Sequence, residues 1–302
     1  MSHQTLISAA DLKSAMARRE PLVLLDCGFE LADTQAGQRA YDAGHLPGAC
    51  YAHLDGDLSG AKTGHNGRHP LPARADLAVT LGRWGIAPGV QVVTYDDQAM
   101  PYAARAWWLL RWMGHTAVAV LDGGRTAWAR TGGTLVSDLP RPSPVAPYPA
   151  AATPGMPIID AEGLLALLEQ QTLRLPGQQP MRLLDARAAE RFRGEVEPLD
   201  PVAGHIPGAT QRFFKDNLGS DGCFKPAAQL RAEFALLLPP PATASDQDSG
   251  VIHQCGSGVT ACHNLLAMSH AGWDPTLLYP GSWSEWCSDA GRPMVKASAN
   301  AR

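Results

Sequence analysis

The residue with the clearest chemical potential is Cys255, which opens the segment CGSGVT at residues 255–260. The apolar residues before it, in GVIHQC, are typical of a short buried strand, and ACHNLL after it is typical of a helix. Gly256 and Gly258 let the connecting backbone curl, so that N–H groups point at the cysteine. The positive end of the helix dipole adds to this field and favours a thiolate. The pattern predicts a nucleophile that could also carry a negatively charged terminal sulfur.

The other cysteines and histidines have weaker chemical contexts. A lone intracellular cysteine is more often a small buried side chain, and we expect packing or surface positions for Cys27, Cys50, Cys223 and Cys287. Cys262 and His263 lack the paired spacings of zinc ligands, so we expect them to pack on the helix. The sequence therefore predicts no metal site and no cofactor.

The chain contains three blocks twice, in the same order. They are LLD at 24–26 and 183–185, GHLPGA at 44–49 and GHIPGA at 204–209, and LDGGRTAW ending at Trp128 and LYPGSWSEW ending at Trp286. Nearly constant offsets between the blocks indicate a tandem duplication. By these offsets Asp97 corresponds to Cys255, so the first copy lacks the thiol and we expect it to be inactive.

Both copies read as alternating strands and helices, which predicts an α/β fold with a parallel sheet flanked by helices in each copy. Ser8 with Asp11, and Asp160 with Gly163, have the spacing of helix N-caps. The tryptophans at helical spacing are expected to form core; they are Trp107, Trp108 and Trp112.

A stretch rich in Pro, Ala and Ser separates the two copies. It has neither a helical nor a strand period, and proline favours extended backbone, so it predicts a semi-rigid linker along the surface. We place an inactive domain at residues 1–135, the linker at 136–156 and a catalytic domain at 157–302.

Composition excludes several classes of protein. The 302 residues carry a formal net charge of −4, which argues against nucleic acid or an anionic membrane as the partner. The sequence contains no apolar run long enough to span a membrane. The first residues lack the apolar core and cleavage site of a secretion signal, and six cysteines are too sparse for a disulfide scaffold. We therefore expect a cytoplasmic protein, and a monomer.

In combination, these motifs resemble the two-domain rhodanese family of sulfurtransferases over nearly the whole chain. The resemblance rests on GHLPG and GHIPG, on DARAAERFRG at residues 185–194, on the CGSGVT loop and on GSWSEW near the C-terminus. It implies two similar α/β domains, of which only the C-terminal one is active. It also implies that Cys255 takes a sulfane sulfur from a donor, becomes a persulfide and passes the sulfur to cyanide or a thiol.

Within the family, the loop resembles the 3-mercaptopyruvate branch. Thiosulfate enzymes usually carry two cationic residues after the cysteine, where this chain has Gly256 and Ser257. The alternatives are a thiosulfate:cyanide sulfurtransferase and a non-catalytic persulfide carrier. Phosphatases of the same fold need an arginine six positions after the cysteine; Ala261 stands there, so a phosphate ester would have no charge clamp.

The resemblance implies that Arg191, in RFRG, binds the anionic group of the donor, because a guanidinium can hold a carboxylate at two points. Mercaptopyruvate enzymes commonly have a second arginine in an EPR segment, but this chain reads EPLD and has Leu199 instead. Arg187 and Arg193 lie nearby without matching the motif. This departure counts against strict mercaptopyruvate specificity.

The resemblance also implies a polar triad that polarises the donor carbonyl. His69 matches a histidine of the mercaptopyruvate branch, Asp55 is the best match for its carboxylate partner, with Asp57 as the alternative, and Ser257 completes the set. His65 and Arg68 lie in the same segment, and no motif assigns them a role. The remaining loop residues are expected to bind the substrate; they are Gly256, Gly258, Val259 and Thr260. The implied partners are a small-molecule sulfur donor, a thiol or cyanide acceptor and a thioredoxin-like reductant.

Overall fold

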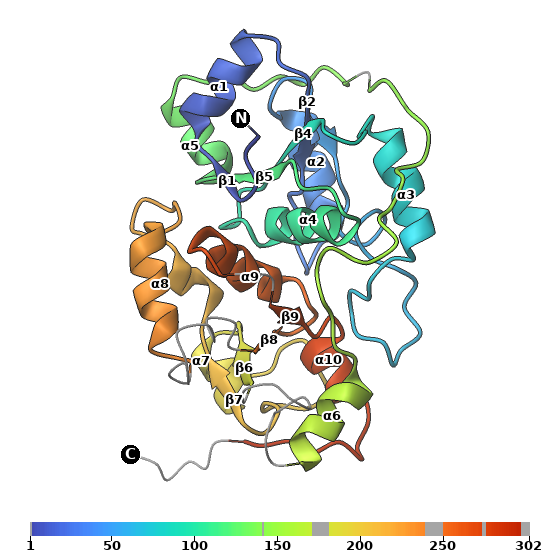
Figure 1. The fold of residues 1–302 in the computed structure, drawn as a ribbon, viewed down its shortest axis with the longest axis vertical. Helices are drawn as coiled ribbons and strands as arrows, with labels where there is room; N and C mark the ends of the chain where they lie inside the picture. Colours follow the sequence, from blue (N-terminus) through green and yellow to red (C-terminus); the bar gives the residue numbers. More distant parts are fainter. Residues whose placement is uncertain (1, 141, 171–180, 239–249, 274–275, 297–302) are drawn as a thin grey trace. The chain divides into compact units, whose positions relative to one another are not determined.

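The computed structural model describes residues 2–140, 142–170, 181–238, 250–273 and 276–296, and it forms two compact units. The first unit contains Met1–Gly60, Leu71–Met156 and Leu218–Phe224; the second contains Ala61–Pro70, Pro157–Asn217 and Lys225–Arg302. Figure 1 traces the elements of both units from the N-terminus in blue to the C-terminus in red. Each unit therefore takes in one short segment from the other half of the chain.

The first unit is built on a five-stranded parallel sheet with the strand order β1-β5-β4-β2-β3. The strands are β1 (Leu6–Ile7), β2 (Leu22–Asp26), β3 (Cys50–Tyr51), β4 (Gln91–Tyr95) and β5 (Val118–Leu121). The helices are α1 (Ala9–Ala17), α2 (Ala36–Ala43), α3 (Arg74–Arg83), α4 (Pro101–Trp112) and α5 (Gly124–Arg130). Asp26 at the end of β2 pairs in register with Tyr95 at the end of β4.

Helices cover both faces of this sheet because its strands are apolar on both sides. On one face, Leu12 of α1 and Trp128 of α5 pack with Leu24 and Val93 from the strands. Figure 1 shows α1 and α5 side by side. Towards the other face, the hydroxyl of Thr94 donates to a carbonyl of α4 at 3.0 Å. The prediction of a parallel sheet flanked by helices is confirmed for this copy.

The second unit has a four-stranded parallel sheet with the order β7-β6-β8-β9. Its strands are β6 (Arg182–Asp185), β7 (Ala209–Gln211), β8 (Val251–Gln254) and β9 (Leu277–Leu278). Its helices are α6 (Ala161–Glu169), α7 (Ala189–Arg193), the 3-10 helix η1 (Phe214–Asn217), α8 (Ala227–Ala235), α9 (Thr260–His270) and α10 (Ser282–Trp286). A parallel bridge from Ile158 to Leu278 continues the sheet beyond β9, where β1 lies in the first copy.

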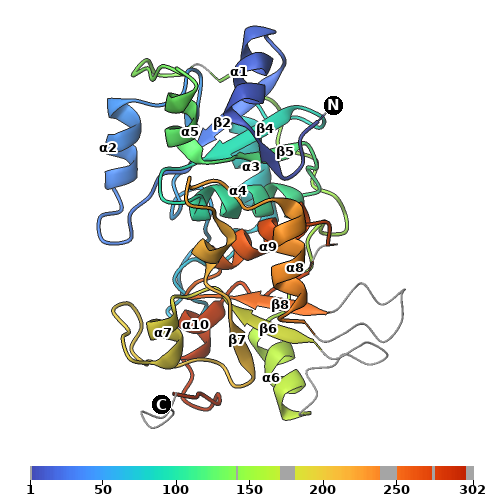
Figure 2. The same cartoon turned by 90° about the vertical axis from the view of Figure 1, so that its left-hand side faces the viewer.

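One hydrophobic core of the second unit lies between the sheet, α6 and α10. Leu164 of α6 and Trp283 of α10 pack there against Leu183 and Ile252 from β6 and β8. Figure 2 shows α8 and α9 on one side of β6 and β8, with α6 on the other. The duplicated sequence therefore folds into two sheets of the same plan, and the predicted fold class is confirmed.

Several local predictions are confirmed in detail. Ser8 Oγ accepts a hydrogen bond from the N–H of Asp11 at 3.1 Å, and Asp160 accepts one from the N–H of Gly163 at 2.8 Å. Both side chains cap the helices that the sequence predicted, because they bind amides that the first turn leaves without partners. The core prediction also holds for the buried side chains of Trp107, Trp108 and Trp112.

The proline-rich segment after α5 lies along the first unit. The N–H of Val145 donates to the carbonyl of Gly82 at 2.9 Å, and that of Tyr148 donates to Ala78 at 2.9 Å. Both acceptors are carbonyls of α3. Through them the segment becomes part of the surface of the first unit.

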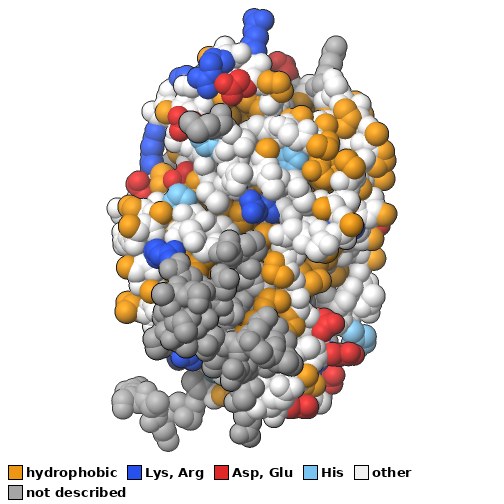
Figure 3. Space-filling model, viewed as in Figure 1, with side chains coloured by type: hydrophobic (Ala, Val, Ile, Leu, Met, Phe, Trp, Pro, Cys, Tyr) orange, Lys and Arg blue, Asp and Glu red, His pale blue; other side chains and the backbone are white. Residues whose placement is uncertain are grey.

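Charged side chains of both signs are interspersed among the described residues on the face shown in Figure 3. Within the described ranges, no helix has the length and apolar character needed to cross a membrane.

Candidate active site

The loop after β8 places Cys255 at the carboxyl end of a central strand. β8 lies between β6 and β9, and residues 255–259 lead from it into α9. In open parallel sheets, ligands bind beyond the carboxyl ends of the strands. Cys255 is 1% exposed, so its sulfur is shielded from bulk water. The predicted strand, loop and helix around this cysteine are confirmed.

The first residues of α10 hold this loop in its curled form. The carbonyl of Cys255 accepts from the N–H of Trp283 at 3.0 Å, and that of Gly256 accepts from the N–H of Ser284 at 2.9 Å. The N–H of Cys255 donates to Oγ of Ser282 at 3.1 Å. In a trans peptide the C=O and the following N–H point in opposite directions, so the amides after these two carbonyls point away from α10. The GSWSEW block thus orients the amides of the loop.

Both the backbone conformation and the close packing at position 258 require glycine. Its φ is +75°, in the left-handed region that favours glycine. A Cβ atom there would lie 2.2 Å from the carbonyl oxygen of Pro280. Its own carbonyl accepts a hydrogen bond from the thiol of Cys262 at 3.3 Å. Cys262 and His263 are fully buried on α9, as predicted.

Ser257 and His69 meet within the second unit although they are far apart in the sequence. Oγ of Ser257 and Nδ1 of His69 are hydrogen-bonded at 2.7 Å. Both residues are buried, with 6% and 4% of their surface exposed. Ser257 lies two residues after Cys255 in the loop, so the hydroxyl and the imidazole are in contact close to the cysteine. Such a pair can polarise an oxygen and move a proton.

Two guanidinium groups lie beside the loop. Arg191 of α7 pairs with Glu197 at 2.6 Å and lies 3.4 Å from Asp200. Arg68 forms an ion pair with the same Asp200. A Cβ atom on Gly256 would lie 2.8 Å from Nη2 of Arg68 and 3.5 Å from Nη1 of Arg191. The sequence motifs identified only Arg191. The one feature of the sequence that could have indicated Arg68 is its position directly before His69.

The two other arginines that lie near Arg191 in the sequence are held by other groups. Arg187 bonds to Asp185 at 2.7 Å and to the carbonyl of Gly204 at 2.8 Å. Burial opposes the charge of Arg187, but Asp185 together with Glu197 and Cys255 favours it, so the pKa of Arg187 is raised. Arg193 pairs with Glu195 at 2.7 Å on the surface.

The two candidate carboxylates for the triad lie in the first unit, whereas His69 lies in the second. Asp57 forms an ion pair with Arg83 and accepts the N–H of His53 at 2.9 Å, so each of its oxygens has a partner. The N–H of Asp55 donates to Nδ1 of His53 at 3.1 Å. The pairing of Asp55 with His69 stays a prediction.

Four other cysteines are poor nucleophiles at neutral pH. Burial raises the pKa of Cys27 and Cys50, and it raises the pKa of Cys223 and Cys287 to about 11. A thiol with a raised pKa stays protonated and reacts slowly. Among the described residues, no three His, Cys, Asp or Glu side chains are grouped to hold a metal ion.

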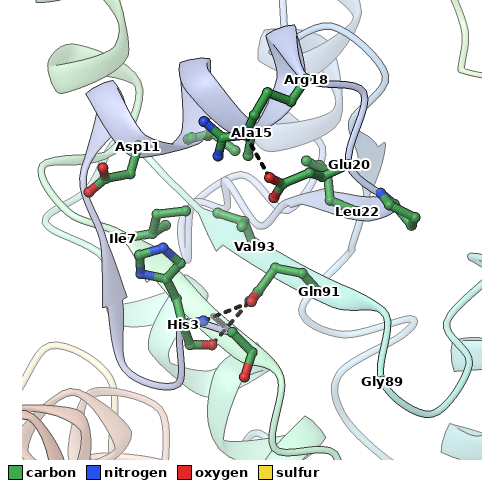
Figure 4. A pocket seen from close by; sticks show the side chains of 13 residues that line it. His3, Ile7, Asp11, Ala15, Arg18, Glu20, Leu22, Gly89, Gln91 and Val93 are labelled. Carbon is green, nitrogen blue, oxygen red and sulfur yellow. Dashed lines mark hydrogen bonds and ion pairs between the residues drawn. The ribbon is translucent and has the colours of Figure 1, made fainter.

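A separate pocket of about 340 Å³ lies in the first unit, between α1 and the beginning of β4 (Figure 4). Its polar groups pair with one another: Arg18 bonds to Glu20 at 2.7 Å, and the N–H of His3 donates to Gln91 at 2.9 Å. No cysteine lines it. The groups suited to sulfur chemistry therefore lie in the second unit.

Comparison with known proteins agrees with this arrangement. A rhodanese-like domain matches the chain twice, at residues 8–131 and 163–289. The chain is 47% identical over 300 residues to the "Probable 3-mercaptopyruvate sulfurtransferase" of Pseudomonas aeruginosa, covering 98% of this chain and 99% of that protein. It is 32% identical over 272 residues to the thiosulfate sulfurtransferase of Mus musculus, covering 88% and 84%.

Solved structures show the same fold. The 3-mercaptopyruvate sulfurtransferase from Leishmania major superposes with a TM-score of 0.77 at 26% identity, covering 94% of this chain and 74% of that one. Relatives named for both sulfur donors thus match over most of the chain. The protein is a sulfurtransferase with two rhodanese-like domains, and it belongs to the family of 3-mercaptopyruvate and thiosulfate sulfurtransferases.

Proposed function

We propose that this enzyme takes its sulfur from 3-mercaptopyruvate and carries it as a persulfide on Cys255. The observation that carries the proposal is the Ser257–His69 hydrogen bond of 2.7 Å beside the nucleophile's loop. A hydroxyl paired with an imidazole suits a donor with a carbonyl next to its reacting carbon. Thiosulfate has no carbonyl and gives this pair nothing to polarise.

In the first half of the reaction, the thiolate of Cys255 attacks the sulfur of 3-mercaptopyruvate. A sulfur–sulfur bond forms, the carbon–sulfur bond breaks, and its electron pair leaves on the enolate of pyruvate. Ser257 and His69 stabilise the developing enolate oxygen and supply the proton that converts it to pyruvate. Cys255 is left as a persulfide, with the loop amides and α9 favouring its negative charge.

In the second half, an acceptor attacks the outer sulfur of the persulfide. The sulfur–sulfur bond breaks and its electrons return to Cys255 as a thiolate. Cyanide leaves as thiocyanate and a thiol leaves as a persulfide, which a thioredoxin-like reductant can then reduce. No cofactor is needed, because the electrons balance within the two substrates and the cysteine.

The other predicted site residues take supporting roles in this proposal. Asp55 orients His69, and Arg191 binds the carboxylate of the donor. The remaining loop residues surround the transferred sulfur and the donor; they are Gly256, Gly258, Val259 and Thr260. Such groups act mainly by holding the reacting atoms in line.

Thiosulfate is the second candidate donor, and a specific observation favours it. Arg68 and Arg191 both approach Gly256, so two guanidinium groups lie beside the loop, each paired with a buried carboxylate. Their N–H groups can donate to the oxygens of a dianion. The donors therefore have to be compared on one enzyme preparation.

The test is the ratio of kcat/KM for 3-mercaptopyruvate to that for thiosulfate, with cyanide and a dithiol as acceptors. We expect the ratio to exceed one. A ratio below one would show that thiosulfate is the preferred donor. Turnover with neither donor, in a protein that still gains sulfur on Cys255, would indicate a persulfide carrier.

A further inference from the structure

The segment that carries His69 belongs to the second unit, although it lies in the first half of the sequence. It meets that unit at the beginning of α10. The N–H of Arg68, the residue directly before His69, donates to Oγ of Ser284 at 3.0 Å. Gly67 has a φ of +83°, and a Cβ there would lie 2.8 Å from the carbonyl oxygen of Gly281 and 3.2 Å from Oγ of Ser284. The backbone of this segment is therefore seated closely on the start of the helix.

Ser284 joins this segment to the loop of the nucleophile. Its hydroxyl accepts the N–H of Arg68 and donates to a carbonyl of its own turn at 3.2 Å. Its own N–H donates to the carbonyl of Gly256 at 2.9 Å. Arg68 is one residue before His69, and Gly256 is one residue before Ser257. Ser284 thus bonds to the backbone next to both members of the polar pair.

The contact between His69 and Ser257 needs this alignment. Nδ1 and Oγ are 2.7 Å apart, although the two residues are 188 positions apart in the sequence. A hydrogen bond weakens steeply when its distance or angle departs from the preferred range. Since the two side chains come from separate segments, their distance depends on the bonds that hold those segments together.

The first unit receives a segment from the other half of the chain at the matching place. Its segment 218–224 meets the turn before α5, where the N–H of Phe224 donates to Asp122 at 2.8 Å. This turn is the counterpart of the turn before α10 in the repeated blocks, and by the same offset Thr126 corresponds to Ser284. A threonine therefore occupies this helical position in the first copy.

We propose that Ser284 is a positioning residue that aligns His69 with Ser257 for sulfur transfer. Through the backbone of Arg68, its hydroxyl holds the imidazole where it can deliver the proton to the enolate. The inference deepens the proposed function and rests on it for the role of His69. Because Ser284 acts through His69 and binds no part of the donor, its loss should lower kcat and leave KM nearly unchanged.

The first test is the kinetics of variants at position 284 with 3-mercaptopyruvate. In Ser284→Ala we expect kcat to fall about 5- to 100-fold, the range for losing one hydrogen bond that aligns a reacting group. Ser284→Thr keeps the hydroxyl and should retain most of the activity. Ser288→Ala is the matched control, because Oγ of Ser288 donates to the carbonyl of Glu285 at 2.8 Å just after α10, and it should leave kcat unchanged.

A double-mutant cycle with His69→Ala tests the route of the effect. If Ser284 acts through His69, Ser284→Ala should lower kcat no further once the imidazole is absent. A full additional loss in that background would overturn the inference, because the hydroxyl would then act on the Cys255 loop itself. An unchanged kcat in the single variant Ser284→Ala would overturn it as well.

The reaction of His69 with diethyl pyrocarbonate, followed by peptide mass spectrometry, separates this inference from the choice of donor. His69 is 4% exposed, so we expect slow reaction in wild type and in Ser288→Ala. Ser284→Ala should raise the rate roughly five-fold or more, because losing one hydrogen bond makes local opening easier. If the enzyme does not turn over 3-mercaptopyruvate, the proposed function fails while this rate still decides whether Ser284 holds His69. Equal rates in wild type and Ser284→Ala would overturn the inference.

Discussion

The loops after β4 and β8 occupy the same place in the two copies and have opposite chemistry. Asp26 pairs in register with Tyr95, and Asp185 pairs with Gln254. The next residue is Asp96 in the first copy and Cys255 in the second. The repeat offset had predicted Asp97 as the counterpart of Cys255; the strand register corrects this by one residue.

In the first copy, the side chain of Asp96 occupies the loop after β4. The carboxylate of Asp96 is buried and accepts four backbone N–H groups, those of Gln98, Met100, Tyr102 and Ala103, at 2.8 to 3.0 Å. A strand, loop and helix of this kind can therefore gather four donors around one negative group. In the second copy the corresponding residue carries a sulfur, which the proposed reaction makes the carrier of the transferred group. The same plan of strand, loop and helix thus holds a carboxylate in one copy and the cysteine in the other.

In both copies an arginine binds the matching glycine carbonyl and aspartate carboxylate, but the two arginines come from different elements. In the first copy, Arg125 of α5 bonds to the carbonyl of Gly44 at 2.9 Å and to Asp26 at 3.2 Å. In the second, Arg187 serves the matching Gly204 and Asp185. In the second copy this arginine comes from the segment before α7, while α10 binds the Cys255 loop.

The largest expected effect comes from removing the sulfur that distinguishes the copies. Cys255→Ser should lower sulfur transfer from every donor by more than about a thousand-fold, because a hydroxyl at neutral pH cannot replace a thiolate. The circular dichroism spectrum of the variant should match that of wild type, which would show that the fold is unchanged. Mass spectrometry after donor treatment should place one added sulfur on Cys255 of the wild type. An adduct on Cys262 instead would break the assignment.

Ser257→Ala removes the hydroxyl bonded to His69. We expect kcat with 3-mercaptopyruvate to fall by roughly ten- to a thousand-fold, the range for losing a polarising donor or a proton-transfer partner. The thiosulfate rate should change little, and Ser257→Lys should shift preference towards thiosulfate by adding a cation. Steady-state kinetics of both variants with both donors would measure this. Equal losses on the two donors would limit Ser257 to shaping the loop.

Arg191→Ala should raise KM for an anionic donor by about 10- to 100-fold, with a smaller change in kcat, if it binds substrate and transition state alike. Arg191→Lys should restore the affinity only in part, because an ammonium lacks the two-point geometry. Kinetics indistinguishable from those of wild type in the Ala variant would assign Arg191 to the ion pair with Glu197 alone.

The smallest effect concerns stability and tests the loop of the first copy. Burial raises the pKa of Asp96 to about 6, above the 3.8 of an ordinary aspartate, in spite of its four N–H partners. The folded chain then binds a proton more tightly than the unfolded chain, so this contribution to stability is present below pH 3.8 and is lost as the pH rises through about 6. Relative to Asp96→Asn, wild type should gain about 2 kcal/mol between pH 7 and pH 4.

Urea unfolding of both proteins at the two pH values would measure this difference. The activity of folded Asp96→Asn should stay near that of wild type, because the substitution lies in the copy without the thiol. A stability difference that does not depend on pH would show that Asp96 has the same ionisation in the folded and unfolded chains.

Short-range patterns determined much of this protein from sequence alone. The duplication, the α/β class, the caps at Ser8 and Asp160 and the loop around Cys255 each depend on a few neighbouring residues, whose periods and backbone preferences are local. Arg191 was assigned through the family resemblance of its short motif, and its role in binding the donor stays a prediction.

Tertiary structure decided what depends on the path of the chain. Arg68 reaches Gly256, and α10 clamps Cys255, because segment 61–70 and the C-terminal helix pack on the second unit. No local pattern encodes such contacts. The correspondence between Asp96 and Cys255 could not be found from the sequence either, because loops of unequal length make the repeat offset differ from block to block. Hydrogen bonds between paired strands fix that register, and they form only when strands distant in sequence come together.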